Sequence, residues 1–361
     1  MDYLEPRSDS EKVDLAFIVD CTGSMGSYIN QVQKHVQHIA ETISRTSFDV
    51  RLALIEYRDH PPQDKSYVTR VNDFTSNLKD MKSWVDKMKA DGGGDWPEAV
   101  ADALKAGTKL SYRKQATKMC VLIADAPPHG LDENGDGFPN GCPDGHDPLD
   151  ACHVMAEKGI VLYCIGCEPS VDSFRDFLIG LAHITGGQYV PLREAKTLTK
   201  VIINAAGEEV SLEKLMGHAT DFLYLKMKEM KVKQKNIKVD DLAEELQKNL
   251  KITNNQCRRL QIDDQPLDPV TEDGKTYSQM KKMSQAKDLY TKRKRNKKAN
   301  RSGKGITTGN ESVDIGEKKH ISGPQAARIT KKIIARNRIP VTHDEEKDEI
   351  VIFDSIPEVM Y

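Results

Sequence analysis

The sequence has no run of about 18 consecutive apolar residues, the length that a membrane-spanning helix needs. Its start, MDYLEPRSDSEK, also lacks the basic segment and apolar core of a secretory signal. The seven cysteines are odd in number, and Cys120 and Cys164 lie in apolar runs, so reduced thiols are the simpler interpretation. We therefore expect no membrane association and a cytoplasmic location, with the nucleus as the alternative.

Strong net charge and the common nucleotide-binding motifs are missing as well. The formal net charge is −2 at pH 7, so attraction to nucleic acid requires a local patch. Neither a Walker loop (GxxxxGK followed by Ser or Thr) nor a dinucleotide fingerprint (GxGxxG) follows an apolar strand. These absences argue against the usual nucleotide-dependent enzymes.

Apolar runs in the first 215 residues alternate with segments of helical periodicity. This alternation predicts an α/β fold with a doubly wound, mostly parallel, Rossmann-like sheet. Strands are expected at 13–20, 50–57, 119–124, 160–165 and 188–190, with a short edge strand near 67–68. Helices are expected at 28–43, 78–88, 97–110, 171–184 and 196–215. A further helix should follow the insertion and end near residue 158.

The character of the chain changes after about residue 215, where Lys/Glu-rich helical patterns replace apolar strands. Residues 281–304 carry eleven basic residues against Asp288 alone, a block that repels itself and is not expected to pack. We therefore predict an N-terminal tail (1–11), an α/β domain (12–215), a helical extension (216–280) and a basic, flexible tail (281–361). The extension as a whole is expected to be helical and partly disordered.

Oxygen-bearing side chains stand where the predicted strands end. Asp20, Thr22 and Ser24 follow the first strand, and Asp125 follows the strand at 119–124. Asp95 lies in the Gly-rich loop 91–95, which must pass over the same edge of the sheet. Because ligands collect at the carboxyl ends of parallel strands, these five residues predict a site for Mg²⁺, with Ca²⁺ or Mn²⁺ as alternatives. In another interpretation, Asp20 and Asp125 only cap turns and helices.

The pattern D-x-T-x-S, a Gly-rich second loop and an Asp after the fourth strand resembles the metal-ion-dependent adhesion site of von Willebrand factor A (vWA) domains. The resemblance covers about 12–215, and VDCTGSM, LALIEYRDH, GGGDWPEAV and DAPPHG are most similar to the vWA domains attached to atypical α-kinases. It implies hydroxyl ligation by Thr22 and Ser24. It also implies acidic ligands at Asp20 and Asp125, and a partner protein whose acidic side chain completes the coordination.

The second loop departs from the family pattern, because Asp95 stands where many relatives have Thr, with Glu98 as the alternative. Three carboxylates around a divalent ion leave a formal charge of −1. Such a site should hold the metal more tightly but attract an anionic partner less.

The predicted function is a metal-dependent protein-binding module without catalytic activity. One alternative is a Mg²⁺-dependent phosphoryl-transfer enzyme of haloacid-dehalogenase type, but such enzymes use a second Asp two residues after the first, and Thr22 stands there. Another alternative is a regulatory domain related to the α-kinases. The chain after residue 215 is too short and too polar for a kinase catalytic domain.

Two further motifs resemble metal sites. The segment 132–137 imitates the start of a calcium loop, but Pro143 replaces the bidentate Glu, so a turn-rich insertion is favoured. A zinc site could be assembled on paper from several thiols and imidazoles, but strand alternation and the following turn aim Cys164 and Cys167 differently, so small buried side chains are favoured. The residues concerned are Cys142, His146, Cys152, His153, Cys164 and Cys167.

The run Lys292–Lys298, KRKRNKK, is typical of a nuclear-localisation signal or a nucleic-acid patch. Tyr290 is the only nearby aromatic that could stack on a base. A solvated linker explains the run equally well.

Overall fold

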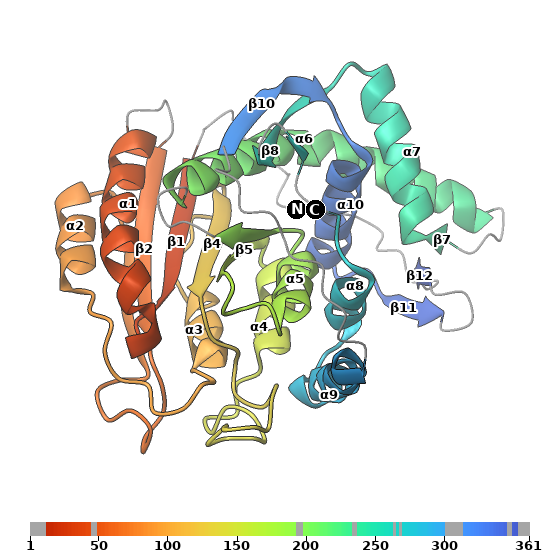
Figure 1. Ribbon diagram of the computed structural model, residues 1–361. Helices are drawn as coiled ribbons and strands as arrows, with labels where there is room; N and C mark the ends of the chain where they lie inside the picture. The colour runs from red at the N-terminus through yellow and green to blue at the C-terminus, as the bar shows by residue number, and fades with distance from the viewer. Residues whose placement is uncertain are drawn as a thin grey trace.

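A six-stranded sheet in the order β3-β2-β1-β4-β5-β6 forms the centre of the molecule (Figure 1). The computed structural model describes residues 12–44, 49–192, 198–232, 237–262, 265–266, 269–299, 313–344 and 349–352. The strands are β1 (Lys12–Asp20), β2 (Asp49–Tyr57), β3 (Thr69–Thr75), β4 (Thr117–Ala124), β5 (Ile160–Cys167) and β6 (Tyr189–Leu192). All neighbours pair in parallel except β3, which is antiparallel to β2 at the edge. The predicted doubly wound, mostly parallel fold is confirmed.

Side chains of β1 alternate between two buried cores, as the pleat of a strand requires. Leu15, Phe17 and Val19 enter one core, and Ala16 and Ile18 enter the other. The first core is covered by α1 (Gly26–Ser44), α2 (Leu78–Lys87) and α6 (Leu198–Val232). The second is covered by α3 (Val100–Gly107), α4 (Pro148–Glu157) and α5 (Arg175–Ile184). Burial on both faces explains why β1 reads as a continuous apolar run.

Helix α6 continues through the domain boundary predicted at residue 215 and reaches the C-terminal elements (Figure 1). Together with α7 (Val239–Ile252) and α10 (Gly323–Arg336) it encloses a third core. Two three-stranded sheets accompany these helices. They consist of β8 (Gln256–Ile262), β9 (Gln265–Pro266) and β10 (Val313–His320), and of β7 (Ile237–Lys238), β11 (Val341–Asp344) and β12 (Glu349–Ile352).

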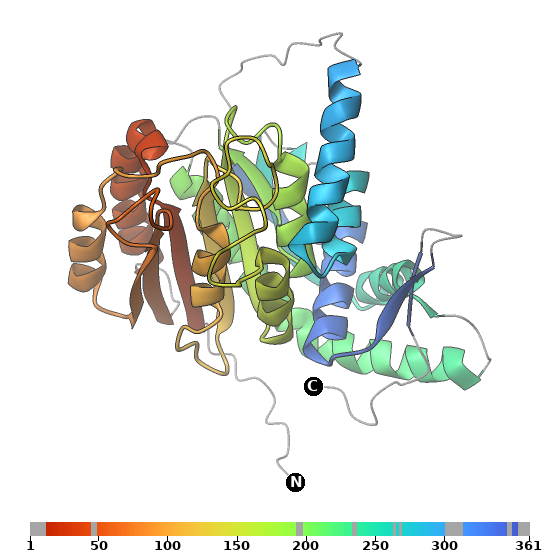
Figure 2. The ribbon, with the colours of Figure 1, turned by 90° about the horizontal axis from the view of Figure 1, so that it is seen from below.

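Two helices occupy the region for which the sequence predicts a flexible basic tail. These two helices are α9 (Met283–Ala299) and α10, and α8 (Glu272–Gln279) precedes them in the chain. Helix α9 lies beside the sheet domain in Figure 2. Ala286 and Tyr290 of α9 are buried in the second core, and Ile329 and Ile333 of α10 in the third. The structure therefore differs from the prediction, because apolar pairs four residues apart give these charged helices a buried stripe. Residues 300–312 and 353–361 lie outside the described part.

Buried ion pairs connect α10 to α6. Arg328 Nη1 lies 3.1 Å from Glu208 Oε1, and both Arg328 and Lys332 pair with Glu209. The Tyr163 hydroxyl of β5 donates to Glu209 Oε1 at 2.8 Å. These charges are almost completely buried, so each depends on its partners.

None of the helices in the described ranges combines the length and apolar character needed to cross a bilayer.

Candidate functional site

Asp20 and Asp125 leave the sheet side by side, because Val19 of β1 is paired with Ile123 of β4. Asp20 Oδ1 accepts hydrogen bonds from the Thr22 backbone N–H at 2.9 Å and the Thr22 hydroxyl at 2.6 Å. The Thr22 and Ser24 hydroxyl oxygens are 3.1 Å apart, and Ser24 Oγ donates to Asp125 Oδ1 at 3.0 Å. Four of the five predicted ligands therefore form one continuous cluster.

The Gly-rich loop lies directly over this cluster, as the sequence predicts. The Gly23 N–H donates to the Gly92 carbonyl at 3.0 Å, and the Asp91 N–H donates to the Cys21 carbonyl at 3.1 Å. Gly93 has φ +74°, and a Cβ there would lie 2.7 Å from Glu98 Oε1 and 3.2 Å from Thr22 Cβ. Only glycine suits this position, where Glu98 and Thr22 approach the same point of the backbone.

Asp95 contacts a different set of residues. Its Oδ2 accepts from the Gly137 backbone N–H, and its carboxylate lies within 4.8 Å of His129 and Asp136. The His129 ring is held between Asp59 Oδ1 at 2.7 Å and Asp136 Oδ1 at 2.8 Å. The structure thus places Asp95 in a neighbouring acidic cluster around His129, a residue that the sequence analysis did not single out.

Three buried carboxylates, those of Asp20, Asp125 and Glu98, have pKa values that are raised by burial or by one another's charges. Burial and the neighbouring charge of Asp125 raise the pKa of Asp20 to about 7, and burial raises the pKa of Asp125. Burial and the charge of Asp20, among other carboxylates, raise the pKa of Glu98 to about 11. Asp20 Oδ2 and Glu98 Oε2 are buried without a hydrogen-bond partner. These oxygens fit a hard divalent cation, whose charge would offset the repulsion among the three carboxylates.

The cluster can be reached from solvent. Asp20 and Thr22 are buried, whereas Ser24 is exposed. Trp96, next to Asp95 in the chain, is exposed as well, and its ring centroid lies 5.9 Å from that of Phe174. A cation bound by this cluster would therefore be accessible from the side of Ser24.

The calcium-like segment 132–137 is held by protein donors. Asp132 Oδ1 accepts from the Asn134 backbone N–H at 3.2 Å, as in an Asx turn. Asp132 Oδ2 accepts from the Tyr290 hydroxyl at 3.0 Å and pairs with Lys294. These contacts agree with a turn-rich insertion, and they fix it to α9.

The basic run is partly engaged in intramolecular contacts. Lys294 pairs with Asp132 and Arg293 pairs with Asp273, whereas Lys292 and Arg295 are exposed. The side chains of 296–298 lie outside the described part. A nucleic-acid patch would therefore have fewer available charges than the run contains.

A known protein family matches the part of the chain that forms the six-stranded sheet. The family model of the von Willebrand factor type A domain matches residues 14–201, just over half of the chain. The chain therefore belongs to the von Willebrand factor type A domain family, as its resemblance at the sequence level predicts.

Two curated relatives align with parts of the chain. A putative ariadne-like RING finger protein of Acanthamoeba polyphaga mimivirus is 30% identical over 218 residues, 58% of this chain and 21% of the relative. An alpha-protein kinase, vwkA, of Dictyostelium discoideum is 34% identical over 140 residues, 38% of this chain and 22% of the relative. The aligned part is thus about a fifth of each relative's length.

Solved structures that align with part of the chain include the open form of the pilus adhesin SpaC from Lactobacillus rhamnosus GG. It is 14% identical with a TM-score of 0.44, over 56% of this chain and 30% of the adhesin. An aerotolerance-related membrane protein from Bacteroides fragilis is 13% identical with a TM-score of 0.38, over 54% of this chain and 98% of that protein.

Proposed function

We propose that this chain is a metal-ion-dependent protein-binding module and not an enzyme. The cation is Mg²⁺, with Ca²⁺ or Mn²⁺ as alternatives of the same hard-ligand class. Thr22 and Ser24 supply hydroxyl oxygens, and Asp20 and Asp125 supply carboxylates directly or through water. Glu98 replaces Asp95 as the acidic residue of the second loop, because Glu98 approaches Thr22 while Asp95 bonds to Gly137.

The observation that carries this proposal is that Asp20 Oδ2 and Glu98 Oε2 are both buried without a hydrogen-bond partner. A buried polar atom without a hydrogen bond costs about 1–3 kcal/mol, and a buried charge costs more. Protonation of the carboxylates relieves the cost only in part, because a protonated carboxyl still needs an acceptor. A divalent cation satisfies both oxygens and offsets the mutual repulsion of Asp20, Asp125 and Glu98.

The formal charge of the metal-bound site bears on the chemistry of the partner. A divalent ion with three carboxylates has a formal charge of −1, so an acidic partner side chain gains less there than at a neutral site. Trp96 follows the Gly-rich loop in the chain, and its exposed side chain offers a partner an apolar contact. We therefore expect partner binding to depend on Trp96 as well as on the metal.

Phosphoryl transfer of haloacid-dehalogenase type is disfavoured by the contacts of Thr22. In that chemistry the residue two positions after the first Asp acts as a general acid. Here Thr22 donates a 2.6 Å hydrogen bond to Asp20, and a hydroxyl cannot replace a carboxylic acid at neutral pH. Turnover of phosphate esters that is lost in Asp20→Asn would overturn this assignment.

A regulatory role beside an α-kinase is a second candidate, favoured by the 34% identity to a protein named as an alpha-protein kinase. We expect no autophosphorylation of this chain by itself. A positive result in a radiolabelled-ATP assay would contradict the non-enzymatic assignment.

The test is affinity capture from cell lysate in Mg²⁺ and in EDTA, with wild type, Ser24→Ala, Trp96→Ala and the control Ser27→Ala. Ser27 is exposed on α1, three residues from Ser24, and lies outside the proposed ligand set. We expect specific partners only in Mg²⁺, with wild type and Ser27→Ala. An unchanged partner set in EDTA would show that binding does not need the metal.

A further inference from the structure

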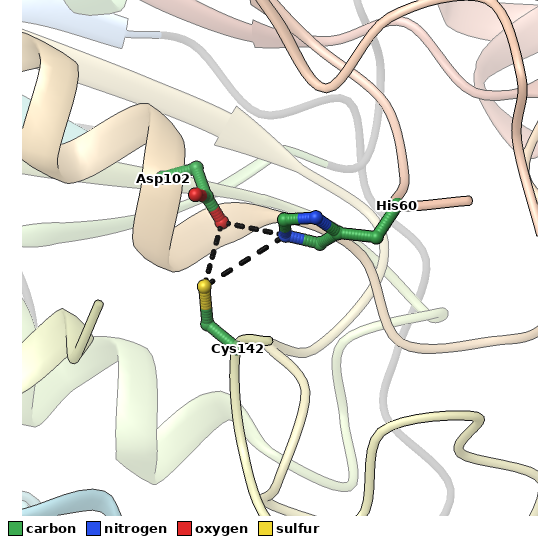
Figure 3. A group of neighbouring side chains, drawn as sticks. All are labelled: His60, Asp102 and Cys142. Atoms are coloured by element: carbon green, nitrogen blue, oxygen red, sulfur yellow. Dashed lines mark hydrogen bonds and ion pairs between the residues drawn. The ribbon is translucent and has the colours of Figure 1, made fainter. Parts of the chain in front are cut away.

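A second group of metal-ligating side chains lies outside the vWA site, on three separate segments (Figure 3). His60 follows β2, Asp102 lies on α3, and Cys142 lies on the insertion between β4 and α4. His60 and Asp102 are buried, and Cys142 is half-buried. The other six cysteines, all within the described residues, are buried. Cys142 therefore differs from the thiols that only fill the core.

Three potential ligand atoms of this group converge on one point (Figure 3). His60 Nε2 lies 2.9 Å from Asp102 Oδ2, Cys142 Sγ lies 3.1 Å from the same oxygen, and Sγ and Nε2 are 3.7 Å apart. Around a tetrahedral zinc ion, with bonds of about 2.0–2.3 Å, ligand atoms are separated by roughly 3.3–3.6 Å. Shifts of a few tenths of an ångström would admit the ion.

We propose that His60, Asp102 and Cys142 bind a zinc ion, independent of the hard-cation site at Asp20. One imidazole nitrogen, one thiolate and one carboxylate form a ligand set that suits zinc and does not suit Mg²⁺. The fourth position is open to water or to a further ligand. This site differs from the zinc site considered at the sequence level, because Cys152, Cys164 and Cys167 remain in the core.

His146 supports the carboxylate of this site. Its Nδ1 lies 2.8 Å from Asp102 Oδ1, the oxygen that His60 and Cys142 do not contact. A hydrogen bond to the second oxygen fixes a ligating carboxylate in place, as the outer residues of zinc sites do. Asp102 and His146 also line a surface pocket, so the carboxylate side of this group opens toward solvent.

The geometry argues against a catalytic Cys-His-Asp arrangement. In such a triad the acid holds one imidazole nitrogen and the thiol contacts the other. Here Asp102 and Cys142 both contact His60 Nε2. Convergence on one nitrogen is the arrangement of ligands around a shared cation.

Zinc would change the state of the thiol and connect the loops. In the absence of a cation, burial and the Asp102 carboxylate raise the pKa of the Cys142 thiol to about 12, and the thiol donates to Asp102. A coordinated thiol gives its proton to solvent. The ion would then cross-link the insertion to α3 and to the loop after β2, next to the Asp59–His129 pair.

Cobalt is a direct probe, because Co²⁺ occupies zinc sites and thiolate ligation produces a near-ultraviolet charge-transfer band. The full chain is first stripped of metal with a chelator and kept reduced. It is then titrated with Co²⁺ in the presence of excess Mg²⁺, so that Mg²⁺ fills the proposed hard-cation site at Asp20. We expect a band that saturates at one Co²⁺ per chain and disappears when Zn²⁺ is added. The absence of this band in the reduced wild-type protein would overturn the proposal.

Variants locate the site. Cys142→Ser should abolish the band, His60→Gln and Asp102→Asn should weaken Co²⁺ binding by about 10-fold or more, and Ser24→Ala should leave it unchanged. A band that persists in Cys142→Ser would assign the thiolate to another cysteine. A further check uses the native chain without substitutions, alkylated in the presence and absence of Zn²⁺ and analysed by mass spectrometry. Zn²⁺ should protect Cys142 from alkylation. Equal alkylation of Cys142 with and without Zn²⁺ would contradict the site.

Discussion

Ser24 Oγ donates a 3.0 Å hydrogen bond to Asp125 Oδ1 across a separation of 101 residues. This contact joins the turn after β1 to the end of β4. Because Asp20 Oδ1 accepts from Thr22, and Thr22 contacts Ser24, the bond completes a chain of four oxygen-bearing side chains at one edge of the sheet. The proposed function depends on this convergence.

The acidic residue of the second loop can be identified by two substitutions that each replace a carboxylate with the amide of similar shape. Glu98→Gln removes a buried carboxylate beside Thr22 and should weaken Mg²⁺ binding by about 10-fold or more. Asp95→Asn alters a carboxylate that bonds to Gly137 and should have a smaller effect. Calorimetric titration of both variants decides between them, and the reverse order would restore Asp95 as the ligand.

The pH dependence of stability should depend on His129. Burial lowers the pKa of His129, but its hydrogen bonds to Asp136 and Asp59 outweigh burial and raise it to about 9. Because this pKa exceeds the unfolded value, the stabilisation is full below about pH 6.5 and is lost as the pH rises through about 9. Denaturant unfolding in EDTA should show wild type more stable than His129→Gln by about 2 kcal/mol at pH 6 and by much less at pH 10. A difference that does not change with pH would contradict the bridging imidazolium.

The buried ion pairs between α6 and α10 predict a large effect on stability. Glu209→Gln leaves Arg328 and Lys332 buried with less compensating charge, so the free energy of unfolding should fall by about 3 kcal/mol. Glu244→Gln, on the exposed face of α7, is the matched control and should change it by less than about 0.5 kcal/mol. Equal stability of the two variants would show that α10 does not depend on these pairs.

Much of the fold and most of the main cluster follow from local sequence patterns. β1 reads as a strand because both its faces are buried, and Asp20, Thr22 and Ser24 come at fixed spacing directly after it. Asp125 is adjacent because β1 and β4 are neighbours in the sheet, which the family resemblance implies. Periodicity and strand ends therefore give the positions of these residues, and the family resemblance gives the strand order that brings Asp125 to the other three.

The remaining features depend on long-range contacts that spacing does not encode. The proposed choice of Glu98 over Asp95 rests on the approach of Glu98 to Gly93 and on the Gly137 N–H, which lies in a distant insertion and bonds to Asp95. His60 and Cys142 are 82 residues apart and meet only when that insertion folds against α3. The helix α10 looks like solvated surface in the sequence because its charges are buried only in pairs with α6.

The most direct test of the central claim is calorimetric titration of the full chain with Mg²⁺ at neutral pH, comparing wild type, Asp20→Asn, Ser24→Ala and Ser27→Ala. Wild type and Ser27→Ala should each bind one Mg²⁺ with the same affinity. Ser24→Ala should bind about 10-fold more weakly or worse, and Asp20→Asn should show no binding. Equal Mg²⁺ binding by all four proteins would contradict a cation held by the Asp20, Thr22, Ser24 and Asp125 cluster.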